Sequence, residues 1–237
     1  MKILPNIGVI DLALFFDSTL VISDVHIGYE EALNKQGVLV PRLQFGEIVR
    51  RVEKIFNILK DKKIERIIIN GDLKHEFGTI SEQEWRNTLK FIDLLAKHCN
   101  EVILIKGNHD NILGPIAKKR NVKVVEEFGV GSILVIHGDK IPGSFKDYDT
   151  VIIGHEHPAV SLKDGPRIEQ FKCFLKGKYK GKNLVVQPSF NSMIEGTDIL
   201  KDSILSPFLK QNLDNFDVYV VEDKVYEFGK LKGLRKR

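Results

Sequence analysis

Short apolar runs alternate with amphipathic stretches through the first half of the chain. Two runs between Gly8 and Val25 predict a β-hairpin, and the runs at 66–70 and 101–105 predict buried strands. Between them, apolar residues recur at helical spacing from Leu43 to Leu59. This spacing predicts a long amphipathic helix, with Pro41 as its first-turn proline.

A second helix is expected to begin at Ser81, because Glu84 stands three residues later in the pattern of a capping box. It should run to about His98, and a shorter helix is expected near 111–119. Beyond Val122 the pattern changes, and strands are predicted at 122–125, 132–136, 150–153, 184–187, 216–221 and 224–228. The change predicts an α/β fold: a four-layer α/β/β/α sandwich with two mixed sheets packed face to face.

The length suits a single domain over residues 1–237. Two segments lack a clean period and are expected to be insertions, the Lys- and Gly-rich stretch at 163–182 and the stretch at 192–215. The basic end, residues 230–237, is expected to be a frayed and solvated tail.

Five of the predicted strands end in residues that bind metals. The five sequences and their candidate ligands are LVISDVH (Asp24, His26), RIIINGD (Asp72), VILIKGNHD (Asn108, His109, Asp110), ILVIHGD (His137) and VIIGHEH (His155, His157). Strands that run in one direction bring their C-terminal ends to one edge of a sheet, where open α/β sheets bind ligands. The pattern therefore predicts a polynuclear metal site.

Each motif alone has a structural explanation, such as a capped turn or a satisfied core pair. All five in order, each after an apolar strand, are hard to explain by packing. Imidazoles and carboxylates without a thiolate suit Mn²⁺, Fe²⁺ or Zn²⁺. Two such ions about 3.5–4 Å apart can generate hydroxide from a shared water and neutralise charge on a phosphoryl group.

The five blocks together resemble the calcineurin-like metallophosphoesterase superfamily over residues 20–160. The resemblance implies two divalent ions, Mn²⁺ being our first expectation. One would be held by Asp24, His26, Asp72 and His157, and the other by Asp72, Asn108, His137 and His155. Asp72 would then bridge the ions, His109 would be the general acid, and Asp110 would orient His109.

A narrower resemblance is carried by the blocks GDLKHEF and HGD and by the stretch CFLKGKYKGKNLVVQPSFN. They look like the SbcD-related small phosphoesterases, including the DNA-ligase-associated branch. The SbcD nucleases carry G-D-x-x-D where this chain has Gly71-Asp72-Leu73-Lys74-His75, and they carry a capping domain after the core. The departure argues against double-strand-end processing. Lys74 and His75 are candidates for binding a substrate phosphate.

The charge balance bears on the substrate. The formal net charge is +4, which is mildly basic, and the clusters at 118–120 and 176–182 are compatible with nucleic-acid contact. Cys99 and Cys173 lack motif spacing and are expected to be reduced. We also find no signal-peptide pattern and no apolar run long enough for a membrane span, so a cytoplasmic protein is expected.

The expected reaction is hydrolysis of a phosphodiester, in nucleic acid or a nucleotide, by a metal-bridging hydroxide with His109 as the acid. Two alternatives stay open. One is a phosphomonoesterase or cyclic-nucleotide phosphodiesterase acting on a small metabolite. The other is a non-enzymatic metal-binding scaffold in a DNA-repair assembly. Nothing in the sequence indicates the oligomeric state.

Overall fold

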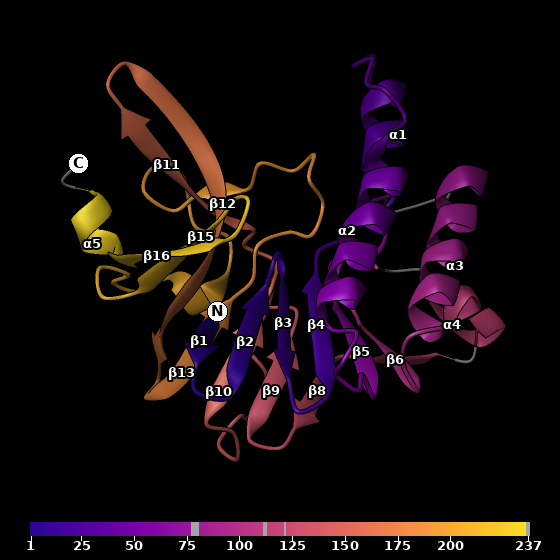
Figure 1. Cartoon of the computed structure of the whole chain (residues 1–237), viewed down its shortest axis with the longest axis horizontal. Coiled ribbons are helices and arrows are strands. Elements are labelled where there is room, and N and C mark those ends of the chain that lie inside the picture. The colour runs from indigo at the N-terminus through magenta and orange to yellow at the C-terminus, as the bar shows by residue number, and fades with distance from the viewer. Residues whose placement is uncertain (77–80, 111–112, 121, 236–237) are drawn as a thin grey trace.

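The apolar runs of the sequence form the strands of two β-sheets (Figure 1). The computed structural model describes residues 1–76, 81–110, 113–120 and 122–235. Within them the first sheet has seven strands, in the order β1 (Lys2–Leu4), β2 (Ile7–Ile10), β3 (Ala13–Phe16), β4 (Thr19–Ser23), β5 (Arg66–Asn70), β6 (Glu101–Ile105) and β7 (Lys123–Val125). The strands from β1 to β4 are antiparallel neighbours, and those from β4 to β7 run parallel.

The second sheet has nine strands in the part of the chain that the structure describes. They are β8 (Glu127–Val130), β9 (Ile133–Ile136), β10 (Thr150–Ile153), β11 (Pro158–Asp164), β12 (Arg167–Tyr179), β13 (Lys182–Val186), β14 (Thr197–Asp198), β15 (Asp217–Val221) and β16 (Val225–Lys230). Strands β9, β10 and β13 are parallel, and β12 runs antiparallel to β11, β13 and β15. Both sheets are therefore mixed, as predicted.

The register of the parallel strands places the metal-binding motifs at one level. In the first sheet Ser23 pairs with Asn70, and Asn70 pairs with Ile105. In the second sheet Ile136 pairs with Ile153, and Ile153 pairs with Val186. Each of these residues ends its strand, so the motifs that follow start side by side at one rim of each sheet.

Alternate side chains of the second sheet enter two different cores. Ile152 and Val185 belong to the core shared with the first sheet, whereas Ile153 and Val186 belong to a second apolar cluster. This follows from the alternation of side chains across a strand. The second cluster is covered by η1, a 3₁₀ helix (Pro207–Leu209), by the short helix α5 (Leu231–Leu234) and by loops. These form the thin outer layer of the predicted four-layer sandwich.

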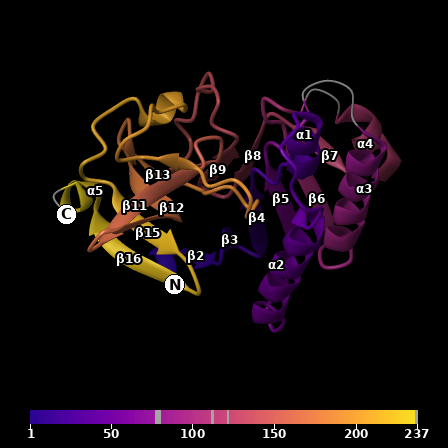
Figure 2. The same cartoon turned by 90° about the horizontal axis from the view of Figure 1, so that it is seen from above.

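Helices cover the other face of the first sheet. They are α2 (Gln44–Ile58), α3 (Glu82–Ala96) and the shorter α4 (Gly114–Arg120). Helix α1 (Tyr29–Lys35), which is as short as α4, precedes them along the chain. In both views α2, α3 and α4 gather at one end of the molecule, away from the β11–β12 hairpin (Figures 1 and 2). No helix among the described residues is long and apolar enough to cross a membrane.

The helix boundaries agree with the predictions, with one correction. Helix α2 begins at Gln44, so Pro41 precedes it and does not occupy its first turn. Ser81 caps α3 as predicted, since its Oγ accepts the N–H of Glu84 at 3.0 Å. Residues 111–112 of the predicted third helix lie outside the described residues.

The segment predicted as an insertion at 163–182 is part of the second sheet. Strand β12 occupies most of it, and its residues Cys173, Phe174 and Leu175 are fully buried. The lysines and glycines on either side of this short apolar stretch obscured the strand in the sequence. By contrast, the stretch at 192–215 contains only β14, η1 and loops.

The basic end of the chain is also more ordered than predicted up to Leu234. Strand β16 runs to Lys230, and α5 follows with Leu231 and Leu234 both buried in the second apolar cluster. Their spacing of three residues places both leucines on one helix face. Residues 236–237 of the predicted tail lie outside the described residues.

Replacement of Leu231 by alanine tests this packing. Because Leu231 is 0% exposed, Leu231→Ala should lower the free energy of unfolding by about 2–5 kcal/mol, measured by urea denaturation. The matched variant Lys232→Ala removes an exposed neighbour and should change it by less than about 0.5 kcal/mol. Equal effects of the two variants on the free energy of unfolding would contradict the packing of Leu231 and support a solvated tail.

Candidate metal centre

The turns that follow the parallel strands have an unusual backbone conformation. Five of the seven residues that the resemblance implies as metal ligands have positive φ: Asp24 (55°), His26 (46°), Asp72 (47°), His155 (62°) and His157 (50°). Residues other than glycine seldom adopt this left-handed region, and such strain clusters at functional sites. His155 and His157 thus lie in a turn after β10 and not in an extension of the strand.

The first group of candidate ligands consists of Asp24, His26 and His157. Their ligand atoms all lie within 4.8 Å of one another. Nε2 of His157 is 3.3 Å from Oδ1 of Asp24 and 3.4 Å from Nε2 of His26. Asp24 is fully buried, so its carboxylate is available to groups inside the site and not to solvent.

The second group consists of Asp72, His137 and His155, again within 4.8 Å of one another. Nε2 of His137 lies 3.0 Å from Oδ1 of Asn108 and 3.5 Å from Oδ2 of Asp72. Asn108 thus adjoins the same group. The structure thus brings together residues from each of the two ligand sets that the resemblance implied, and their binding of ions stays a prediction.

Asp72 lies between the two groups. Its Oδ2 is 3.6 Å from Nε2 of His26 in the first group and 3.5 Å from Nε2 of His137 in the second. Its other oxygen, Oδ1, accepts the backbone N–H of His109 at 2.9 Å. One carboxylate oxygen therefore faces both groups, which is the position that a bridging ligand requires.

Two glycines of the motifs allow this convergence. A Cβ atom on Gly107 would come within 2.0 Å of Oδ1 of Asp72. A Cβ atom on Gly154 would come within 2.4 Å of Oδ2 of Asp24 and 2.1 Å of Oγ of Ser23. Each glycine precedes a candidate ligand in sequence and packs against the carboxylate of another strand. The glycines of G-N-H-D and G-H-E-H are thus needed for close approach.

The electrostatics of the site favour divalent cations. Burial, together with the charges of Asp24 and Asp110, raises the pKa of Asp72 to about 9. Burial also lowers the pKa of His155 to about 4 and that of His26 well below its ordinary value. The imidazoles of His26 and His155 are therefore held neutral, as metal ligation requires, and a cation would remove the proton from Asp72. The nitrogen and oxygen donors fit Mn²⁺, Fe²⁺ or Zn²⁺.

His109 is oriented by a different group from the one predicted. Its Nδ1 lies 2.6 Å from the backbone carbonyl oxygen of His75. The carboxylate of Asp110 instead accepts the backbone N–H groups of Gly107 (3.0 Å), Leu73 (3.3 Å) and Lys74 (3.4 Å). Asp110 therefore joins the loops after β5 and β6, and the His75 carbonyl orients the His109 ring.

The two residues proposed to bind substrate have different environments. Lys74 is fully buried, and its ammonium group donates to the backbone carbonyls of Glu76 and His109. The structure thus corrects the prediction that Lys74 contacts a substrate phosphate. His75 is half-buried, and its ring is nearly parallel to that of His109, with centroids 5.2 Å apart. His26, His75 and His109 form a third group that could hold an ion.

Sequence reasoning did not assign a role to the segment after β13. Oγ of Ser189 donates to the backbone carbonyl of Asp24 at 2.8 Å, and the N–H of Phe190 donates to Ser23 at 2.8 Å. The ammonium group of Lys172 holds this segment by donating to the carbonyls of Ser189 and Asn191. The sequence NLVVQPSFN contained the signal, because polar residues follow an apolar strand there as in the five motifs.

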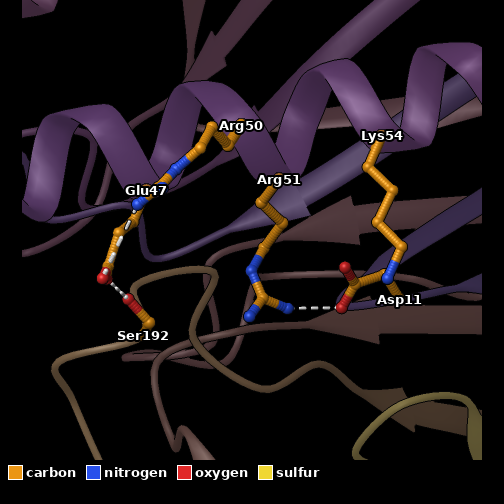
Figure 3. Close-up of a pocket in the computed structure, with 6 residues that line it drawn as sticks. All are labelled: Asp11, Glu47, Arg50, Arg51, Lys54 and Ser192. Atoms are coloured by element: carbon orange, nitrogen blue, oxygen red, sulfur yellow. Dashed lines mark hydrogen bonds and ion pairs between the residues drawn. The ribbon is translucent and has the colours of Figure 1, made fainter.

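Two surface pockets differ in their relation to this centre. A pocket of about 450 Å³ includes Asn108 and Asp110 in its lining and so adjoins the second group. Figure 3 shows another, of about 360 Å³, between α2 and Ser192. There Arg51 pairs with Asp11, and Oγ of Ser192 donates to Glu47 at 2.6 Å. These pairs offset much of the local charge, and we assign that pocket no ligand.

Comparisons with known proteins support the fold. The family model described as calcineurin-like phosphoesterase matches residues 18–151. The crystal structure of Pseudomonas putida nuclease MPE is similar, with a TM-score of 0.64, 21% sequence identity and 92% of each chain covered. Zinc-bound Vps29 from Entamoeba histolytica has a TM-score of 0.39 and 19% identity, covering 88% of this chain and 96% of that one. Curated protein sequences gave no match.

The close approach at Gly107 can be tested by adding one methyl group. Gly107→Ala should displace the Asp72 carboxylate and weaken Mn²⁺ binding about 10–100-fold, measured by titration with electron paramagnetic resonance. The control is Gly143→Ala, whose Cβ meets nothing within 4 Å and should leave binding unchanged. Wild-type affinity in Gly107→Ala would show that Asp72 does not need its observed position.

Proposed function

The chain belongs to the calcineurin-like phosphoesterase family, and we propose that it is a two-metal phosphodiesterase acting on nucleic acid or nucleotides. The observation that carries this proposal is the position of Oδ2 of Asp72, within 3.6 Å of one histidine in each of two ligand groups. A buried carboxylate between two His/Asp groups is the arrangement expected for a dinuclear centre.

The proposed ligand sets are those implied by the sequence. They are Asp24, His26, Asp72 and His157 for one ion, and Asp72, Asn108, His137 and His155 for the other. We propose Mn²⁺, with Fe²⁺ and Zn²⁺ as alternatives of the same donor preference. Bound there, two divalent ions would lower the pKa of a water molecule and neutralise charge on the phosphoryl oxygens.

His109 is the proposed general acid. Because a carbonyl oxygen only accepts, the contact with His75 requires a hydrogen on Nδ1 of His109. The acid is then the imidazolium form, whose second hydrogen is on Nε2, and Nε2 is the nitrogen that gives its proton to the leaving oxygen. The His109 ring lies 4.9 Å from the His26 ring, between centroids, so the acid stands beside the first group.

Four features favour a diester. The pocket beside Asn108 offers room for one substituent of the phosphorus, and the half-buried ring of His75 lies beside His26, with the two Nδ1 atoms 3.4 Å apart. The net charge of +4 favours polyanionic substrates. The similar structure from Pseudomonas putida is described as a nuclease. The SbcD-related resemblance of the sequence points the same way.

We also propose a cytoplasmic location and no membrane partner. Cys99 and Cys173 are both unpaired thiols, which suits a reducing compartment. A substrate with phosphodiester links is the only partner that we propose.

Removal of the His109 imidazole tests its role as the acid. His109→Ala should keep its bound Mn²⁺ and hydrolyse p-nitrophenyl diesters at a rate near that of the wild type. With phenyl diesters, whose leaving oxygen needs a proton, kcat should fall about 10²–10⁴-fold. The control His98→Ala removes an imidazole that stacks on Phe56, and should affect neither ester. Equal losses on both esters would exclude general-acid catalysis by His109.

A panel of substrates tests the reaction itself. With Mn²⁺, the protein should hydrolyse bis-p-nitrophenyl phosphate and single- or double-stranded DNA faster than p-nitrophenyl phosphate. Activity confined to the monoester or to 2′,3′-cyclic nucleotides would replace the diester proposal with the small-metabolite alternative. Bound metal without turnover of any substrate would instead favour a metal-binding scaffold.

A further inference from the structure

Glu84 lies outside the metal centre but contacts the loop that orients His109. It is the third residue of α3, and its side chain is buried, with 1% of the residue exposed. Its Oε1 accepts the backbone N–H groups of His75 at 2.9 Å and of Glu76 at 3.1 Å. The N–H of His75 also lies 3.0 Å from the carbonyl oxygen of Ile27. Glu84 thus holds two consecutive peptide groups of this loop.

One of these peptide groups is shared with His109. The N–H of Glu76 and the carbonyl of His75 belong to a single planar peptide unit, whose ends point in opposite directions. Glu84 binds the N–H end, and Nδ1 of His109 lies 2.6 Å from the oxygen at the other end. Rotation of this peptide would break both contacts, so the position of the Glu84 carboxylate sets the direction of the carbonyl that the His109 ring faces.

The surroundings of Glu84 are built to hold its carboxylate in this place. A Cβ atom on Gly28 would come within 2.9 Å of both Cγ and Cδ of Glu84, so the glycine leaves the space that this side chain fills. The partial positive charge at the start of α3 also favours a carboxylate in its first turn.

Helix capping does not account for this arrangement. In a capping box the Glu84 carboxylate would accept the backbone N–H of Ser81. Instead, Oε1 of Glu84 faces His75 and Glu76, while Oγ of Ser81 accepts the N–H of Glu84 and donates to Glu31. The contact that caps α3, from the backbone N–H of Glu84 to Oγ of Ser81, does not involve the Glu84 carboxylate.

We propose that Glu84 is a positioning residue: through the His75–Glu76 peptide it fixes the orientation of the His109 ring and the Nδ1–H tautomer. The proposal rests on the role of His109 under the proposed function, and it deepens that role. With Nδ1–H donated to the carbonyl, Nε2 is the nitrogen that carries the second hydrogen of the imidazolium and gives it to the leaving oxygen. A displaced peptide would remove the acceptor that keeps the hydrogen of the neutral ring on Nδ1.

The first test observes the tautomer without any reaction. Nitrogen-15 spectra of the imidazoles in the metal-free protein, with His109 assigned by its loss in His109→Gln, should show hydrogen on Nδ1 in the wild type. Glu84→Ala should shift the His109 signals toward the Nε2–H form. Glu84→Gln retains an oxygen acceptor and should keep the wild-type pattern. An unchanged His109 tautomer in Glu84→Ala would overturn the proposal.

The second test uses the Mn²⁺-loaded enzyme. Glu84→Ala should lower kcat for phenyl diesters by roughly 10-fold or more relative to p-nitrophenyl diesters, with its Mn²⁺ content retained. The double variant with His109→Ala should be no slower than His109→Ala alone, because the two residues act as a unit. The control Glu82→Ala removes an exposed partner of Arg86 and should change neither ester. Equal losses on both esters, or additive losses, would indicate a merely structural role.

The two tests separate this proposal from the function on which it rests. If Glu84→Ala changes the tautomer but His109→Ala shows no dependence on the leaving group, the positioning role stands and the general-acid assignment fails. If His109→Ala shows that dependence and Glu84→Ala shows neither effect, the acid assignment stands and the positioning role fails.

Discussion

The central constraint on this protein is the burial of Asp72 beside a second buried carboxylate and among histidines. Burial with nearby negative charge raises the pKa of Asp72 to about 9, and burial also keeps the imidazoles of His26 and His155 neutral. Such a cluster opposes folding unless cations compensate it. The position of one Asp72 oxygen between two ligand groups is therefore best understood as a site shaped for two divalent ions.

The rest of the fold serves this convergence. Shared register brings three parallel strand ends to one level in each sheet, and residues in a left-handed conformation follow β4, β5, β9 and β10. Gly107 and Gly154 allow carboxylates of other strands to approach, and Ser189 ties the second sheet to the carbonyl of Asp24. On the side of the helices, Glu84 and Lys74 bind the backbone of the loop that contains His75, whose carbonyl contacts His109. The contacts that hold these loops and the candidate metal ligands therefore lie in the same turns.

The sequence was sufficient where local pattern determines structure. Apolar runs ending in candidate ligand residues located the strands and the common rim, because parallel strand ends must share an edge, whereas the division into two ligand groups came from the family resemblance. It was not sufficient where long-range contacts decide. Lys74 follows Asp72 directly, yet its ammonium is buried against carbonyls from two loops. The left-handed turn at His155 and His157, strand β12 and the buried leucines of α5 likewise depend on neighbours distant in sequence.

The most direct measurement is anomalous diffraction from crystals of the protein soaked in Mn²⁺. We expect two manganese peaks about 3.5–4 Å apart, one on each side of the Asp72 carboxylate. One ion would be bound by Asp24, His26 and His157, and the other by Asn108, His137 and His155. A single peak, or a peak within the group formed by His26, His75 and His109, would contradict a two-ion centre bridged by Asp72.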